Sequence, residues 1–242
     1  MLKDYKYYII IYIKKIYIIL RLYVFLQINI FPQDLLKQYL NYRKFIKKDG
    51  NKKFKNIIDI GANSGNWTIL FKNIYPNSNF FLIEANPIHK FKLSKITKNY
   101  YMGLLDKSVG YKNFYIYKAF NGTGSSLFKE NSNHSYITKK IKTTTLDKVL
   151  YKKFSKKNYD LIKLDTQGSE LDILKGAKKT LKKTKYIIAE IQIKNYNLKS
   201  PNYKKLNYFL KKNGFKKIQN LYTHIVDNKI SQSDILYKNI NI

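Results

Sequence analysis

Short apolar runs alternate with amphipathic stretches over most of this chain. Four runs have the length and composition of buried strands, at Asn56–Ile60, Phe80–Ile83, Tyr159–Leu164 and Tyr186–Ile191. Helical spacing of apolar residues occupies several of the intervening segments, at Trp67–Tyr75, Ile88–Thr97 and Glu170–Thr184. Strands that alternate with helices predict a doubly wound α/β fold, with a mostly parallel sheet and right-handed crossovers.

Two regions depart from this alternation. Between residues 110 and 145 the pattern becomes β-like and rich in turns, which predicts an insertion. The tail contains a predicted helix at Tyr203–Lys212, and then candidate strands at Phe215–Ile218 and Asp234–Lys238. We therefore expect residues 51–242 to form one domain that contains the insertion at about 110–145.

The first fifty residues are predicted to form a separate helical extension. In Tyr5–Phe31 basic residues interrupt every apolar run before it reaches the ~20 residues of a membrane span, and no small-residue cleavage site follows. At about 100° per residue the basic side chains occupy roughly half of a helix. Residues 1–31 thus either contact a membrane surface peripherally or pack on the domain, and residues 34–49 form a second amphipathic helix. We expect a cytoplasmic protein.

Composition narrows the choice of partners. The net charge is +32, but among 47 basic residues only Arg21 and Arg43 are arginines, and the lysines are scattered along the whole chain. Arginine is the usual reader of bases and phosphates, so this charge favours a compositional bias over a nucleic-acid surface. With no cysteine, disulfides, thiolate zinc sites and a cysteine nucleophile are excluded.

The strongest local motif is the turn Asp59-Ile60-Gly61-Ala62-Asn63-Ser64-Gly65, between a predicted strand and a predicted helix. Glycine permits positive φ and close approach to a ligand, and asparagine is one of the few other residues that adopts the left-handed conformation. About 20 residues after the turn a second strand ends in Glu84, where such folds bind a ribose diol. NAD and S-adenosylmethionine both carry that diol, so these residues predict a nucleoside cofactor without choosing between the two.

Two further segments extend the pattern: Lys163-Leu164-Asp165-Thr166-Gln167-Gly168-Ser169-Glu170, which continues to Gly176-Ala177, and a strand that ends in Glu190. With these segments the chain, from about residue 55 to 240, resembles the FkbM-type methyltransferases. The family shows a D-x-G-A-N-x-G turn, an E-x-N-P second strand and a K-x-D-x-Q-G-x-E segment, in that order.

The resemblance implies a class I methyltransferase fold, which is a Rossmann-like, seven-stranded, mostly parallel sheet with a C-terminal antiparallel hairpin. It also implies S-adenosylmethionine as cofactor and O-methylation of a small-molecule or glycan acceptor. Carried onto this chain, it assigns the methionine end of the cofactor to Asp59, Gly61, Asn63 and Gly65. It further assigns the ribose to Glu84 in Glu84-Ala85-Asn86-Pro87, with Asn86 also at the cofactor and Asp106 beside the adenine.

Methyl transfer to a hydroxyl requires a group that accepts the proton near the methyl group. Asp165, at the end of its strand, is the first candidate, with a pKa that we expect burial to raise. His134, in a predicted loop, is the second. Asp165, Glu170 and Glu190 could instead bind Mg²⁺, but an ion pair with Lys163 is the simpler prediction, so we predict no metal.

Three alternatives remain open from the sequence. An RNA ribose 2′-O-methyltransferase would use the basic surface and a site made of Lys163, Asp165, Glu190 and Lys194. A non-catalytic basic protein on a Rossmann frame would bind membranes or nucleic acids. An NAD-dependent oxidoreductase is disfavoured by the loosened glycine turn and by the lack of a Tyr-x-x-x-Lys pair.

Overall fold

The structure is a computed structural model, and it describes residues 40–42, 53–118, 122–193, 197, 200–226 and 229–242. The chain divides into two compact units, residues 1–52 and residues 53–242. Except for residues 40–42, which are helical, the predicted N-terminal helices at 1–31 and 34–49 lie outside the described residues. Within the described ranges, no helix is long and apolar enough to cross a membrane.

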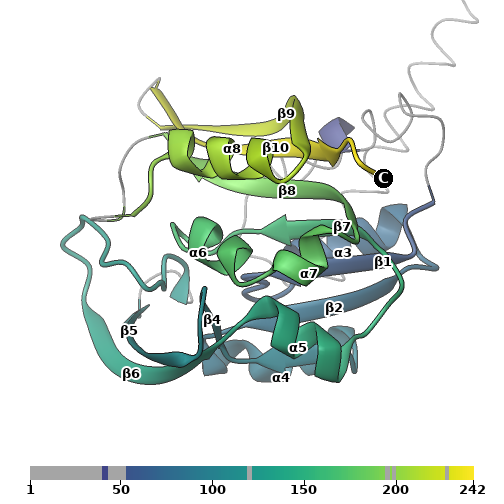
Figure 1. Ribbon diagram of the computed structural model, residues 1–242. Helices are drawn as coiled ribbons and strands as arrows, with labels where there is room; N and C mark the ends of the chain where they lie inside the picture. The colour runs from purple at the N-terminus through teal and green to yellow at the C-terminus, as the bar shows by residue number, and fades with distance from the viewer. Residues whose placement is uncertain (1–39, 43–52, 119–121, 194–196, 198–199, 227–228) are drawn as a thin grey trace, which may run out of the picture. The chain divides into compact units, whose positions relative to one another are not determined.

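A seven-stranded sheet forms the centre of the second unit (Figure 1). Its strand order is β3-β2-β1-β7-β8-β10-β9. The strands are β1 (Asn56–Ile60), β2 (Asn79–Glu84), β3 (Tyr100–Met102), β7 (Tyr159–Leu164), β8 (Thr184–Gln192), β9 (Phe215–Val226) and β10 (Lys229–Asn239). The first five strands in this order pair in parallel, whereas β10 is antiparallel to both of its neighbours. The predicted mostly parallel sheet with a C-terminal antiparallel hairpin is therefore confirmed.

Helices cover both faces of the sheet (Figure 1). On one face lie α3 (Asn66–Ile74) and α4 (Lys90–Ile96), the latter preceded by the 3₁₀ turn η1 (Pro87–His89). The opposite face carries α5 (Leu146–Lys153), α6 (Glu170–Lys175), α7 (Lys178–Leu181) and α8 (Tyr203–Lys212). The single helix predicted over 170–184 is in fact two, since α6 ends before Gly176 and α7 begins at Lys178. At Gly176 an added Cβ would lie 2.5 Å from the carbonyl oxygen of Asp106.

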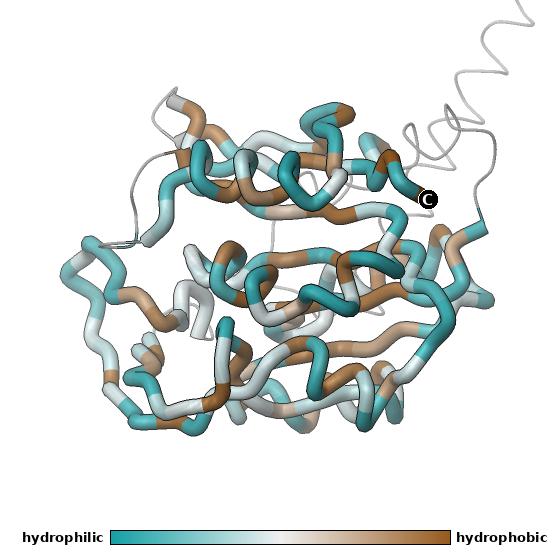
Figure 2. Tube along the Cα trace, in the orientation of Figure 1, coloured by the Kyte–Doolittle hydropathy of each residue, from teal (hydrophilic) through white to brown (hydrophobic). Residues whose placement is uncertain are grey.

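The core follows the apolar runs of the sequence. Hydrophobic residues concentrate on the central strands, while the connecting turns are hydrophilic (Figure 2). All six residues of β7 are buried, including Asp160 and Lys163. Asp160 is paired there, because its carboxylate accepts hydrogen bonds from the N–H groups of Lys55 and Asn56 and from the Lys185 ammonium. The charge of Lys163 is discussed with the candidate site.

Residues 104–144 form a second, three-stranded sheet with the order β4-β6-β5. It consists of β4 (Leu104–Leu105), β5 (Gly110–Tyr117) and β6 (Tyr136–Thr144), seen at the lower left of Figure 1. The segment between β5 and β6 contains the turn Gly122–Ser126. At the end of this turn the Ser126 hydroxyl donates to the carbonyl oxygens of Thr166 (3.2 Å) and Gln167 (2.8 Å), so the turn lies against the loop that follows β7.

Gly61 provides a test of how closely β1 and β7 approach. Its φ is 77°, and an added Cβ would overlap the carbonyl oxygen of Asp165. We expect Gly61→Ala to lower the free energy of unfolding by ~2–4 kcal/mol, since both the backbone conformation and the space exclude a side chain. Gly110→Ala is the matched control, because an added Cβ there has only an ordinary contact at 3.8 Å. Equal urea midpoints for the two variants would contradict the prediction.

Candidate functional site

The turn after β1 has the conformation that its sequence predicts. Gly61, Asn63 and Gly65 have φ values of 77°, 49° and 83°. The N–H groups of Gly61 and Ala62 both donate to the carbonyl oxygen of Ile83 in β2, at 2.9 and 3.1 Å. The turn is thus fixed to the neighbouring strand and leads directly into α3, whose free N–H groups lie at the carboxyl edge of the sheet.

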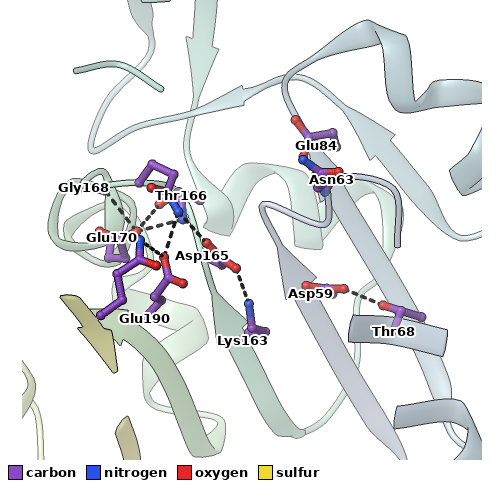
Figure 3. Close-up of polar contacts among 12 residues, drawn as sticks. Asp59, Asn63, Thr68, Glu84, Lys163, Asp165, Thr166, Gly168, Glu170 and Glu190 are labelled. Carbon is purple, nitrogen blue, oxygen red and sulfur yellow. Dashed lines mark hydrogen bonds and ion pairs between the residues drawn. The ribbon is translucent and has the colours of Figure 1, made fainter. Parts of the chain in front are cut away.

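Glu84, at the end of β2, connects the turn after β1 to the loop after β2. Figure 3 shows it beside Asn63 of that turn. Its Oε2 accepts a hydrogen bond from the N–H of Asn63, and its Oε1 accepts one from the N–H of Asn86, both at 2.7 Å. Burial raises the pKa of this carboxyl group, and the backbone hydrogen bonds act in the opposite direction. Because each carboxylate oxygen has two lone pairs, both oxygens retain capacity for a ligand hydroxyl.

Two more of the residues assigned to the cofactor, Asn86 and Asp106, are also buried, in different surroundings. Asn86 begins η1 by accepting from the N–H of Ile88 at 3.3 Å, and its buried Nδ2 has no hydrogen-bond partner among the described residues. Asp106 follows β4, and both of its carboxylate oxygens lie 2.9 Å from the Lys112 ammonium. The structure thus gives the Asp106 carboxylate a structural partner, and its predicted place beside an adenine stays a prediction.

A buried lysine is the centre of the charged groups at this edge. The Lys163 ammonium lies 2.7 Å from Oδ2 of Asp165 (Figure 3). Asp59, Glu190 and Asp234 also interact electrostatically with this lysine, and together the four carboxyl groups raise its pKa although burial acts to lower it. Strand register explains the cluster: Asp59 pairs with Lys163 across β1 and β7, and Asp234 pairs with Glu190 across β10 and β8. The ion pair that the sequence predicts for Lys163 is therefore present, and its partner, which the sequence left open, is Asp165.

Asp59 is the most deeply buried of the four acids. Its Oδ2 accepts a hydrogen bond of 2.6 Å from the Thr68 hydroxyl of α3, and its buried Oδ1 has no hydrogen-bond partner in the described part of the chain. Burial raises the pKa of Asp59 to about 6, and it does so against the opposing effects of Lys163 and Thr68. A buried carboxylate oxygen without a partner is a position at which a ligand donor would be stabilised.

The sequence predicts a raised pKa for Asp165, and this prediction is wrong. Burial alone would raise it, but the Lys163 ammonium and the hydrogen bonds from Glu190, Lys163 and Gln167 together lower the pKa of Asp165. The pKa of Glu190 is instead raised well above its usual range, by burial and by repulsion from Asp165 and Asp234. Burial and mutual repulsion therefore favour one proton on this adjacent pair, with the pKa of Glu190 raised and that of Asp165 lowered.

The loop after β7 is held by its own side chains. Oε1 of Glu170 accepts hydrogen bonds from the N–H groups of Thr166 (2.8 Å) and Gly168 (3.2 Å) and from the Thr166 hydroxyl. Glu170 is thus engaged by the loop rather than grouped with Asp165 and Glu190. Among the described residues no three His, Asp or Glu side chains are arranged to bind a metal ion.

His134, the second base candidate, is exposed, and its Nδ1 lies 3.9 Å from Oε2 of Glu130. The hydrogen bonds and charge interactions given above for Asp165 and Lys163 are made with residues other than His134. Trp67 stacks on Phe71 of α3 with ring centroids 4.0 Å apart, and the Lys163 ammonium lies 5.8 Å from the Trp67 ring centroid. Trp67 thus packs against a neighbouring ring of its own helix.

Gln167 and Ser126 are polar residues of the site that sequence reasoning did not single out. Gln167 has a φ of 53°, and its side-chain amide lies between Asp165 and Glu190. Ser126 reaches the same loop from the insertion. The K-x-D-x-Q spacing was a signal for Gln167, because it places an amide two residues beyond a carboxylate at a strand end. Nothing local to the sequence connects Ser126 to that loop.

These features together fit a nucleoside cofactor with a positive centre. A glycine turn opens onto a helix N-terminus, a buried acid follows the second strand, and a group of carboxylates lies at the end of the central strands. The buried, unpartnered Asp59 Oδ1 and Asn86 Nδ2 offer one acceptor and one donor to such a ligand. The strand order, with β10 antiparallel between β8 and β9, is that of the class I methyltransferases.

Comparison with known families agrees with this class. The family described as the methyltransferase FkbM domain matches residues 59–217, which is more than half of the chain. The chain therefore belongs to this family. It is a methyltransferase that uses S-adenosylmethionine as its cofactor. An NAD-dependent oxidoreductase and a non-catalytic binding protein are no longer supported.

Several solved structures are similar in fold. Methyltransferase FkbM from Methylobacillus flagellatus KT is 17% identical with a TM-score of 0.47, and the match covers 77% of this chain but only 44% of that protein. A magnesium protoporphyrin IX methyltransferase from Synechocystis PCC 6803, with bound S-adenosylmethionine, is 12% identical over 90% of this chain and 88% of that one (TM-score 0.48). An S-adenosylmethionine-dependent methyltransferase from Clostridium acetobutylicum ATCC 824 is 11% identical over 85% and 92% (TM-score 0.48). No curated protein sequence matches this chain.

The raised pKa of Asp59 has a consequence for stability. The folded protein holds this proton up to a pH of about 6, whereas the ordinary pKa of an aspartate is 3.8, so the stability of the folded state falls as pH rises between these two values. Asn mimics the neutral form at every pH. We expect the unfolding free energy of Asp59→Asn, relative to wild type, to increase by about 3 kcal/mol between these two pH values and to change little above them. Urea unfolding between pH 4 and pH 8 measures this, and parallel curves for the two proteins would contradict it.

Proposed function

We propose that this protein transfers the methyl group of S-adenosylmethionine to a hydroxyl group of a sugar, a glycan or a related metabolite. The observation that carries the proposal is the position of Asp165. It lies at the carboxyl end of β7, and its side chain is 29% exposed, while its ion-pair partner Lys163 is buried. This carboxylate can reach a bound acceptor from a fixed position, as proton acceptance requires.

The residues around the carboxyl edge are suited to the parts of the cofactor. Glu84 has lone pairs left for the ribose hydroxyls, and the unpartnered Nδ2 of Asn86 lies two residues beyond it. The turn of Gly61, Asn63 and Gly65 would hold the methionine end, next to the free Oδ1 of Asp59. The cofactor supplies an electrophilic methyl group on a sulfonium. The negative charge of the neighbouring acids favours a ligand with that positive charge.

A carboxylate with a low pKa is adequate for this reaction. A hydroxyl group becomes strongly acidic only while its oxygen forms the new C–O bond, so the proton can move late to a weak base that is already in place. Lys163 and Gln167 hold the two oxygens of Asp165 at 2.7 and 3.1 Å, and this keeps the group ionised and oriented. His134 is the weaker candidate because it is exposed and lies beside Glu130.

The resemblance to FkbM-type enzymes supports a hydroxyl acceptor of the glycan or metabolite type. The RNA alternative has less support. It requires Lys163 as an accessible cation, whereas this side chain is buried against Asp165, and its other lysine, Lys194, lies outside the described residues. Peripheral membrane contact through residues 1–31 stays a prediction on the N-terminal unit.

We expect Glu84→Ala to weaken S-adenosylmethionine binding by at least about tenfold, since the ribose hydroxyls lose a charged acceptor. Isothermal titration calorimetry below the melting temperature measures the dissociation constant. Asp147→Ala is the control, because Asp147 accepts hydrogen bonds only from the start of α7, at Lys179 and Thr180, among its described contacts. An unchanged dissociation constant for Glu84→Ala would show that the ribose binds elsewhere.

We expect Asp165→Asn to bind the cofactor but to lose turnover by at least about 100-fold, because the amide cannot accept the hydroxyl proton. A screen of sugar and glycolipid acceptors with a radiolabelled methyl donor supplies the assay. Asp172→Asn, which removes the ion pairs of this α6 residue with Lys175 and Lys112, is the matched control. Full turnover by Asp165→Asn would move the base to another residue, and labelling of RNA but of no hydroxyl metabolite would favour the RNA alternative.

A further inference from the structure

Gln167 has a backbone conformation that its residue type disfavours. It lies between β7 and α6 with a φ of 53°, in the left-handed region, where a residue other than glycine or asparagine is strained. Two contacts hold it there, because its carbonyl oxygen accepts from the Ser126 hydroxyl at 2.8 Å and from Nδ2 of Asn197. A strained conformation that is fixed by long-range contacts is typical of functional loops.

The side chain of Gln167 joins two acids. Its Nε2 donates to Oδ1 of Asp165 at 3.1 Å and to Oε2 of Glu190 at 2.8 Å, so both amide protons are used on carboxyl oxygens. Its Oε1 accepts from Nε2 of Gln192 at 3.1 Å, which fixes the orientation of the amide. The amide therefore has one defined orientation, and in it the two carboxyl groups lie on either side of one nitrogen.

The surroundings determine how much charge this pair carries. From β7, Lys163 contacts Asp165 directly; from β10, Asp234 faces Glu190; and from β1, Asp59 adds a further acid. Two adjacent ionised carboxylates repel each other, so one proton on the pair lowers the energy. The amide of Gln167 stabilises the remaining negative charge, since hydrogen bonds to a charged acceptor are the stronger ones.

We propose that Gln167 is a positioning residue that holds Asp165 and Glu190 as a pair sharing one proton, with the Asp165 carboxylate beside the transferred methyl group. The inference rests on the proposed role of Asp165. In the reaction the acceptor oxygen forms the new C–O bond, the bond from the methyl carbon to sulfur breaks, and the hydroxyl proton passes to Asp165. Gln167 favours the state before transfer, in which the pair still carries its negative charge.

The charge of the pair can be measured without any acceptor. The measurement compares the affinity of the protein for the charged cofactor with its affinity for the product, which has lost that charge. S-adenosylmethionine carries a positive sulfonium, and S-adenosylhomocysteine lacks it, so the ratio of the two association constants measures the negative charge beside the methyl group. Two substitutions suit the left-handed backbone and remove the bridge. Gln167→Asn keeps an amide that is one methylene too short, and Gln167→Gly has none. Gln219→Asn on β9 makes the same change outside the cluster.

Calorimetric titrations between pH 5 and pH 9, with melting temperatures as a folding control, give the outcome. Without the amide, the remaining negative charge is less stabilised, so the pair takes up a second proton at a higher pH and becomes neutral. We therefore expect both Gln167 variants to lower the affinity ratio about tenfold near neutral pH and to move its pH midpoint upward, with Gln219→Asn at the wild-type values.

Two results would overturn the inference, and they differ in what they imply for the proposed function. If Asp165→Asn lowers the ratio but both Gln167 variants keep the wild-type ratio and midpoint, then Gln167 does not hold the pair, and the proposed function stands. If Asp165→Asn also leaves the ratio unchanged, Asp165 does not face the methyl group, and the inference falls together with the proposed base.

Discussion

The burial of one ammonium group among carboxylates from neighbouring strands is the constraint on which the site depends. Removing an isolated lysine charge from water costs several kcal/mol, so Lys163 can be buried in β7 only because acids surround it. Register supplies these acids: Asp59 lies directly opposite on β1, and Glu190 and Asp234 pair with each other on the other side. A shift of one residue in any of these strands would turn its acid to the opposite face of the sheet and leave the lysine charge uncompensated. The burial of Lys163 therefore depends on this strand order and register, because they bring the acidic partners to the lysine.

Loops at the carboxyl edge hold one another rather than being held by the sheet alone. Glu84 connects the turn after β1 to the loop after β2, and Ser126 connects the insertion to the loop after β7. At Gly122, in the same insertion turn, an added Cβ would lie 2.5 Å from Nδ2 of Asn86, so the insertion also approaches the loop after β2. A movement of the insertion would therefore act on both loops through these contacts. The loop after β2 and the loop after β7 are therefore linked to each other through the insertion.

The sequence predicted those parts of the structure that local pattern determines. Buried strands appear as apolar runs, and Asp59 and Glu84 stand at strand ends where a ribose-binding fold needs them. The pKa of Asp165 could not be predicted in the same way, because its direction depends on Glu190, which is distant in sequence and comes close only through the pairing of β7 with β8. Likewise, no local rule places the glutamine at position 167 in a left-handed conformation, since that conformation is imposed by side chains from other segments. Where long-range contacts override the local preference, the sequence alone gave an incomplete or incorrect expectation.

The net charge of the protein and the charge of its site have opposite signs. The chain has 47 basic residues and 15 acids, yet four of those acids surround Lys163. Salt screens exposed charges beyond roughly 8 Å, so the scattered surface lysines contribute little to the potential inside, whereas the buried carboxylates act at short range in a medium of low dielectric constant. A positive cofactor is therefore compatible with a strongly basic protein. The chemistry of the site follows from the few acids that the sheet brings together, and the lysine content of the surface, which first suggests nucleic acid, is a poor guide to it.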